Sequence, residues 1–155
     1  TNKKIKTWQV VFLAVVFLCY LGLKTWQWRW PEAIVELRGE QLKVLVANTP
    51  AHQYQGLGKR ESLGEYDGML FIFNQKKKAG FVMRAMNFPI DIVWLDEGQV
   101  VDFAPNVPLE PGVKEQDLKI YYPRLEANAV LELPAGWAEK NGLKIGDEMR
   151  VMNEK

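Results

Sequence analysis

Four polar residues have side chains that could orient a ligand: Arg60, Arg84, Asp91 and Asn106 stand among aromatic and methionine residues. Asp91 lies inside the run 89–96, whose Ile, Val, Trp and Leu residues predict a central strand covered on both faces. A buried carboxylate needs partners. Asp91 is therefore either a structural hub, paired with Arg60 or Arg84, or part of a site that binds a small ligand, a glycan or a peptide strand.

Nucleophilic and metal chemistry have little support in the sequence. The chain has one cysteine (Cys19), one serine (Ser62) and one histidine (His52). A Ser-His-acid constellation needs a supporting base beside the nucleophile, and a metal site needs several ligands. We read His52 as a solvent-facing residue of a short helix, and we expect no metal, no cofactor and no assigned catalytic residue.

A possible pair of carboxylates leaves an enzyme as the alternative to a binding function. Asp67 and Asp91 could meet in a cleft and hydrolyse a cell-envelope polysaccharide. Asp91 and Asp96 are five positions apart, so in one regular strand they face opposite sides and cannot pair. The enzyme question stays open, and the sequence favours binding over catalysis.

The charge distribution excludes one class of partner. Five of the 20 basic residues lie in residues 1–30, which contain no acid, so residues 31–155 carry 15 basic and 19 acidic side chains. Nucleic-acid binding requires a clustered basic surface. We therefore expect no nucleic-acid partner.

The N-terminal segment predicts a membrane anchor. A lysine-rich start precedes residues 10–23, which contain no charged or amide side chain. A cleaved signal peptide would share this pattern, but residues 20–23 offer no pair of small residues for cleavage. Counted from Ile5 to Leu23, a helix is about 28 Å long and approaches the thickness of a hydrocarbon core.

Flanking residues set the expected orientation of this anchor. Trp8, Trp26, Trp28 and Trp30 are placed as interfacial side chains, and Lys6 could extend to the lipid headgroups. Three lysines before the apolar run, against two basic residues after it, put the N-terminus in the cytoplasm. We expect a single-pass membrane protein that contacts the bilayer through residues 5–30.

Residues 31–155 form the second unit, a single exported domain. Residues 33–38, 41–47, 69–73, 81–83, 89–96, 100–103, 129–134 and 149–152 have strand patterns, and residues 120–123 could pair at a sheet edge. Helices are expected at 51–57 and 137–140, and residues 104–112 are too rich in proline for a central strand. The fold class is mainly β: a small β-sandwich or jelly-roll-like barrel with one or two short helices, preceded by the transmembrane helix.

Several ordered motifs are similar to those of the bacterial and archaeal domain of unknown function 192. They are Gly56-Leu57, Arg60-Glu61-Ser62-Leu63, Gly68-Met69-Leu70-Phe71-Ile72-Phe73, Phe81-Val82-Met83, Pro89-Ile90-Asp91-Ile92-Val93 through Asp96, Asn106 with Pro108, and Val130-Leu131-Glu132-Leu133-Pro134-Ala135-Gly136 with Gly142 and Gly146-Asp147. This resemblance implies a mainly-β domain, commonly exported or tethered, with no established activity. We expect a membrane-anchored extracytoplasmic module that binds a small ligand, a glycan or a partner protein; its oligomeric state is open.

Overall fold

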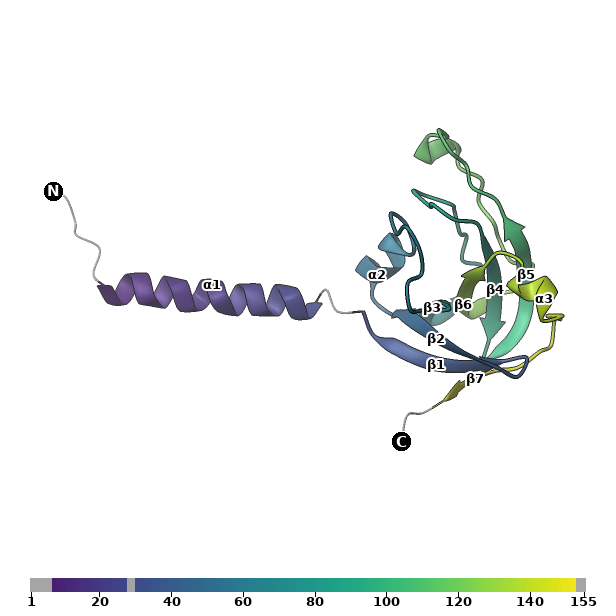
Figure 1. Ribbon diagram of the computed structural model, residues 1–155, viewed down its shortest axis with the longest axis horizontal. Coiled ribbons are helices and arrows are strands. Elements are labelled where there is room, and N and C mark those ends of the chain that lie inside the picture. The colour runs from purple at the N-terminus through teal and green to yellow at the C-terminus, as the bar shows by residue number, and fades with distance from the viewer. Residues whose placement is uncertain (1–6, 28–29, 153–155) are drawn as a thin grey trace. The chain divides into compact units, whose positions relative to one another are not determined.

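The computed structural model of the chain describes residues 7–27 and 30–152. Its contacts divide the chain into two compact units, with the boundary between Trp30 and Pro31. Helix α1, Thr7–Gln27, forms the first unit (Figure 1). No helix within the described residues is long and apolar enough to cross a membrane. The basic tip 1–6 and Trp28 of the expected interface segment lie outside the described residues.

The second unit is built on one seven-stranded sheet in the order β5-β4-β6-β3-β2-β1-β7. Its strands are β1 (Glu32–Leu37), β2 (Glu40–Ala47), β3 (Gly68–Lys77), β4 (Ile90–Asp96), β5 (Gln99–Val107), β6 (Ala127–Pro134) and β7 (Met149–Met152). Two short α-helices, α2 (Pro50–Gln55) and α3 (Trp137–Lys140), and the 3-10 turn η1 (Glu115–Asp117) interrupt the strands. The mainly-β prediction is confirmed.

Two tight turns fix the register of the sheet. Arg38 and Gly39 join β1 to β2, and Glu97 and Gly98 join β4 to β5. All four residues have positive φ, between 49° and 84°, as type I′ turns require, because this turn matches the twist of the paired strands. The first turn lies one residue before residues 39–40, the gap between the predicted strands 33–38 and 41–47.

The sheet curls into a half-barrel (Figure 1). At one end its two edges are joined by the backbone, since the amide of Val100 donates to the carbonyl of Asp147 at 2.8 Å, and that of Met149 donates to Gly98 at 2.7 Å. One curved sheet, rather than two sheets packed face to face, lies nearer to the predicted barrel than to the predicted sandwich. The architecture therefore has few open edges.

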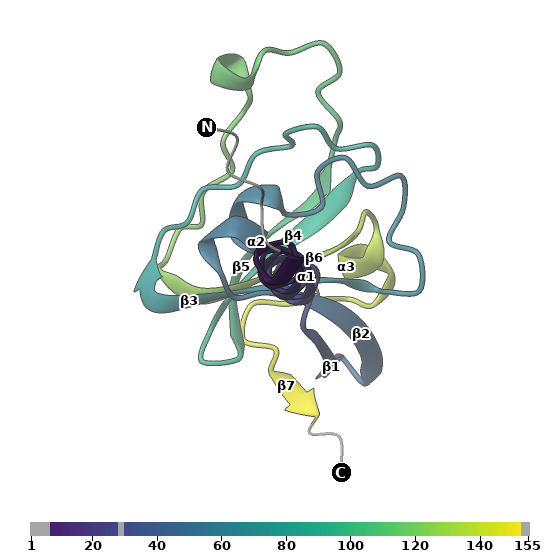
Figure 2. The same ribbon diagram turned by 90° about the vertical axis from the view of Figure 1, so that its left-hand side faces the viewer.

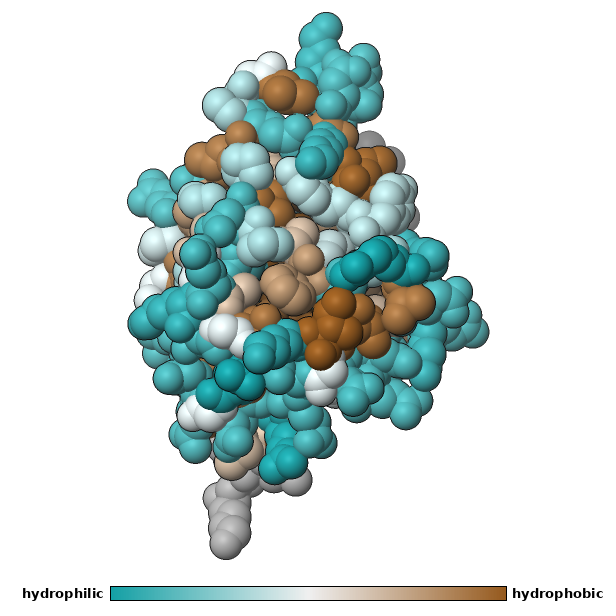
Figure 3. All heavy atoms as spheres, turned by 90° about the vertical axis from the view of Figure 1, so that its right-hand side faces the viewer, coloured by the Kyte–Doolittle hydropathy of each residue, from teal (hydrophilic) through white to brown (hydrophobic). Residues whose placement is uncertain are grey.

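Apolar residues of both faces are buried. On the core face, side chains of all strands pack into one cluster that includes Val35, Leu70, Val93, Leu131 and Leu133. The aromatic face is the opposite side of β3, β6 and β4. Its members alternate with those of the core face and are Met69, Phe71, Val130, Glu132, Ile92 and Trp94. The face of the domain that Figure 3 shows is mainly hydrophilic, with separate apolar groups.

Three local predictions need correction. β5 continues through Pro105 to Val107, which is possible because β5 is at the edge of the sheet, where a missing N–H breaks no central ladder. His52 is buried, not solvent-facing, although it does lie on the short helix α2, which Thr49 caps and which begins one residue before the predicted start at 51. Residues 81–83 do not form the predicted strand: Phe81 pairs with Tyr121 in one isolated bridge, and this is the pairing expected of residues 120–123.

Candidate ligand-binding site

Three aromatic rings fix the floor of the candidate site on the aromatic face. Phe81 packs edge-on against Phe71, with ring centroids 5.0 Å apart, and against Trp94 at 6.4 Å. The indole N–H of Trp94 donates to the carbonyl of Ala79 at 3.2 Å. Edge-to-face packing is the preferred geometry of such rings, so the chain around residue 80 is held firmly on β3 and β4.

A pocket of about 380 Å³ opens above this floor. It is lined by Gln53, Tyr54, Phe71, Phe73, Lys77, Ala79, Gly80, Phe81, Val82 and Arg84. Its walls thus come from α2, β3 and the segment that precedes β4. We call it the aromatic pocket.

The two cations of the aromatic pocket are each placed over a ring. Lys77 Nζ lies 4.1 Å from the centroid of Phe73, and the Arg84 guanidinium carbon lies 4.5 Å from that of Tyr54. Arg84 Nη1 also donates to the carbonyl of Tyr54 at 3.4 Å, and Nε lies 2.7 Å from Oε1 of Glu115. Nη2 of Arg84 has no hydrogen-bond partner among the described residues, so it remains a donor for a ligand.

Arg84 also lines a second pocket of about 410 Å³. This second pocket lies between residues 83–87 and residues 109–118, and its apolar lining is Met83, Ala85, Met86, Leu109, Pro111, Val113 and Leu118. One guanidinium therefore borders both cavities.

Asp91 is a structural hub on the core face. Its side chain is fully buried. Oδ1 accepts from the amides of Asn106 at 2.7 Å and Gly136 at 3.1 Å, and Oδ2 accepts from the amide of Ala138 at 2.7 Å. Because Gly136 and Ala138 begin α3, Asp91 caps this helix from a neighbouring strand.

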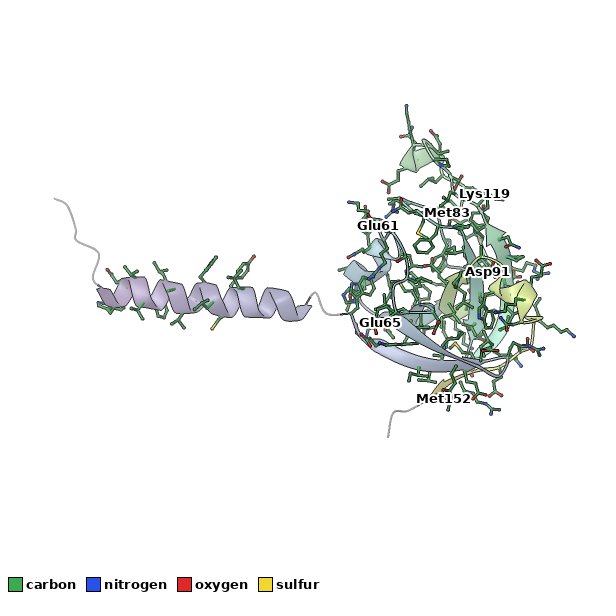
Figure 4. The ribbon with its side chains drawn as sticks, in the orientation of Figure 1. Glu61, Glu65, Met83, Asp91, Lys119 and Met152 are labelled. Atoms are coloured by element: carbon green, nitrogen blue, oxygen red, sulfur yellow. The ribbon has the colours of Figure 1, made fainter. Side chains whose placement is uncertain are left out.

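The four residues predicted to form one site separate into two pairs. Asp91 meets Asn106 through the backbone of Asn106, which has φ +54°, a left-handed conformation that asparagine tolerates. Arg60 and Arg84 lie in adjacent loops, since the Asn87 side chain donates to the carbonyl of Arg60 at 2.9 Å. The expected ion pair of Asp91 with an arginine is wrong, because three backbone amides satisfy the carboxylate. Figure 4 shows Asp91 inside the domain, on the side of α3.

The two acids of the hydrolase alternative are held in separate places. Asp67 Oδ2 accepts from the amide of Lys43 at 2.8 Å, and its own amide donates back to the carbonyl of Lys43 at 2.7 Å. The hydrogen-bond partner of Asp67 is thus Lys43, which is not among the partners of Asp91. Both carboxylates therefore fix the backbone in the observed structure.

Glu132 is a buried acid that the sequence reading did not single out. It lies on the aromatic face, with Met69 and Ile92 directly beside it on the adjacent strands. Its Oε2 has no hydrogen-bond partner among the described residues, and burial raises the pKa of Glu132 to about 8. Glu132 alternates with the apolar residues Leu131 and Leu133, and this pattern predicts a solvent-facing acid. Glu132 is buried instead, because the opposite face of the sheet is also covered by the chain.

Comparisons with known proteins agree with the fold and leave the activity open. The profile of the family DUF192, described as "uncharacterized ACR", matches residues 33–151. A solved structure from Sinorhizobium meliloti, provisionally assigned as a transcription regulator, is 25% identical to this chain, and the two superpose with a TM-score of 0.69. The match covers 79% of this chain and 95% of the Sinorhizobium meliloti chain. A protein of unknown function from Novosphingobium aromaticivorans is 30% identical with a TM-score of 0.65, covering 77% and 83%. No curated protein matches the chain significantly.

Proposed function

Since the chain belongs to the DUF192 family, whose description names no activity, we propose its function from the geometry of the domain. We infer that the domain is a binding module for a small anionic ligand that carries an aromatic or sugar ring. The aromatic pocket is the binding site. This refines the binding role predicted from the sequence, and it places the ligand at Arg84 rather than at Asp91.

The composition of the pocket lining carries the proposal. Four aromatic rings and two cations line the aromatic pocket, and no acid among the described residues does, although acids outnumber bases in residues 31–155. Aromatic faces stack on planar or apolar rings, while Arg and Lys bind carboxylate or phosphate oxygens. A ring with one anionic group is therefore the ligand class that uses both features.

Arg84 is already oriented for this task. Its guanidinium is stacked on Tyr54 and supported by the Tyr54 carbonyl, so little side-chain entropy remains to be lost on binding. A charge-assisted hydrogen bond contributes about 1.5–3 kcal/mol. Loss of the Arg84 contact is thus expected to weaken binding by roughly 10- to 100-fold.

The test compares charged and neutral probes on the purified chain. Isothermal titration would use 4-hydroxybenzoate and D-glucuronate beside the neutral compounds 4-hydroxybenzamide and D-glucose. We expect at least one anion to bind, its neutral counterpart to bind more weakly, and Arg84→Gln and Lys77→Gln to reduce affinity while the matched variant Lys140→Gln does not. Equal binding of charged and neutral probes, or no effect of Arg84→Gln, would contradict the proposal.

We also propose that α1 tethers the domain to a membrane, with the N-terminus cytoplasmic and the domain extracytoplasmic. Ten residues between positions 10 and 23 are Leu, Val or Phe. On insertion scales such residues contribute about 0.3–0.6 kcal/mol each at the centre of a bilayer helix. The described side chains of the helix are exposed in the chain by itself, for example Leu13 at 65% and Leu18 at 65%. A lipid surface would cover them.

Fractionation of cells that express the full chain tests the tether. We expect the protein to stay with membranes after a carbonate wash, and an external protease to remove the domain from spheroplasts. Release by carbonate, or a mature N-terminus beyond Leu23 by mass spectrometry, would show that no anchor is retained.

A further inference from the structure

The segment 108–119, which we call the tip segment, projects from the half-barrel in both ribbon views (Figures 1 and 2). Both of its ends are held. β5 precedes it, and after it the amides and carbonyls of Tyr121 and Phe81 exchange two hydrogen bonds of 2.8 and 3.0 Å. The chain is fixed again where Arg124 Nη2 lies 2.7 Å from Asp102. Motion of the tip segment would therefore be confined between these two points.

Hydrogen bonds within the tip segment are local. The amide of Val113 donates to Glu110, that of Asp117 donates to Lys114, and that of Lys119 donates to the carboxylate of Glu110. Among the described residues, one ion pair is the only hydrogen bond or ion pair that joins this segment to the rest of the domain: Arg84 Nε to Glu115 Oε1 at 2.7 Å. This ion pair is thus the polar contact that holds the tip over the second pocket.

We propose that the Arg84–Glu115 ion pair is a latch, which an anionic ligand in the aromatic pocket opens. This inference rests on the proposed function, because it uses the same guanidinium. A ligand carboxylate that binds Nη2 and Nε together, the bidentate geometry that arginine favours, displaces Glu115 from Nε. The Glu115 side chain is 63% exposed, and exposed ion pairs are weak, so water and a ligand can replace it.

Opening the latch changes the surface of the domain. The tip segment contributes Leu109, Val113 and Leu118 to the second pocket, and the opposite wall contributes Met83 and Met86. Moving the tip away would uncover this apolar wall only when ligand is bound.

Coupling of this kind is reciprocal. If Glu115 competes with the ligand, Glu115→Gln raises ligand affinity by the same factor by which ligand opens the tip. For an exposed ion pair we expect about two- to fivefold.

Limited trypsin digestion of the full chain tests the latch, because Lys114 and Lys119 lie in the tip segment. Cleavage there would be followed by mass spectrometry and normalised to the same bonds in urea-unfolded protein. We expect Glu115→Gln to increase cleavage two- to fivefold without any ligand, and the matched variant Asp117→Asn to leave it unchanged. Saturating 4-hydroxybenzoate should increase cleavage of the unsubstituted chain and have no effect on Glu115→Gln.

The two proposals fail in different ways. Binding of 4-hydroxybenzoate that leaves tip cleavage unchanged or reduces it would overturn the latch and leave the binding function in place. Wild-type cleavage rates in Glu115→Gln would also overturn the latch, whether or not a probe binds. Absence of binding by every probe, with increased cleavage in Glu115→Gln, would refute the proposed ligand class and retain the ion pair as the holder of the tip.

Discussion

Removing the Asp91 carboxylate is the sharpest perturbation that the fold offers. Asp91→Ala leaves the amides of Asn106, Gly136 and Ala138 without their acceptor, and of these bonds the one from Ala138 is buried while the other two are part-buried. An unsatisfied buried N–H costs about 1–3 kcal/mol and each of the other two bonds contributes about 0.5–1.5 kcal/mol, so the loss is roughly 2–6 kcal/mol. Folded domains are typically stable by about 5–15 kcal/mol, and this substitution alone therefore removes a large part of the domain's stability.

Asp91→Asn gives a graded version of the same experiment. The amide oxygen can still accept from Asn106 and Gly136, but the new NH₂ group faces the amide of Ala138, so we expect a loss of about 1–3 kcal/mol. Urea unfolding followed by near-ultraviolet circular dichroism would measure both losses, with the exposed Asp117→Asn as control. If the unfolding free energy of Asp91→Asn lies within about 0.5 kcal/mol of that of the unsubstituted chain, the change is no larger than for a surface substitution, and the hub assignment is refuted.

Two further predictions test the opposite face and the packing of the sheet. Because the pKa of Glu132 is raised from 4.5 to about 8, its contribution to stability is complete below pH 4.5 and is lost as the pH rises toward 8, by up to about 1.4 kcal/mol per pH unit. Glu132→Gln should flatten urea-unfolding stability between pH 5 and 8; an unchanged slope would assign the pH dependence to other groups. Gly68→Ala places a Cβ 2.3 Å from the carbonyl oxygen of Glu132, so it should cost at least about 1–3 kcal/mol. Gly64→Ala meets no atom within 4 Å and should lower the thermal midpoint much less, with its φ of +65° as the main cost.

The strands were predictable because their signals are local. Alternation of apolar residues located β2 and β6 to within two residues, and the short gaps between the predicted strands at 39–40 and 97–99 coincide with both tight hairpins. The closure of the sheet was not predictable in this way. It depends on backbone contacts between residues 98–100 and 146–149, which are distant in sequence and carry no distinctive side chains.

The candidate site was only half predictable, for a related reason. Arg84 was selected as a cation near aromatic residues, and it does line the aromatic pocket. The rings that give the pocket its character, Tyr54 and Phe73, come from α2 and β3, and neither had been linked to Arg84. Asn106 was selected for its side chain, whereas its backbone conformation is what Asp91 uses.

Asp91 and Glu132 show why burial alone does not assign a role to an acid. Both are buried in adjacent strands, β4 and β6, but on opposite faces of the sheet. Asp91 receives three amide donors because its face meets the start of α3 and the end of β5. Glu132 faces Met69 and Ile92, and its Oε2 receives no donor within the described residues, so desolvation dominates its behaviour. The number of hydrogen-bond donors therefore separates the two roles: Asp91 holds the fold together, whereas the cost of burying Glu132 rises with pH. The sequence around each acid does not encode this number.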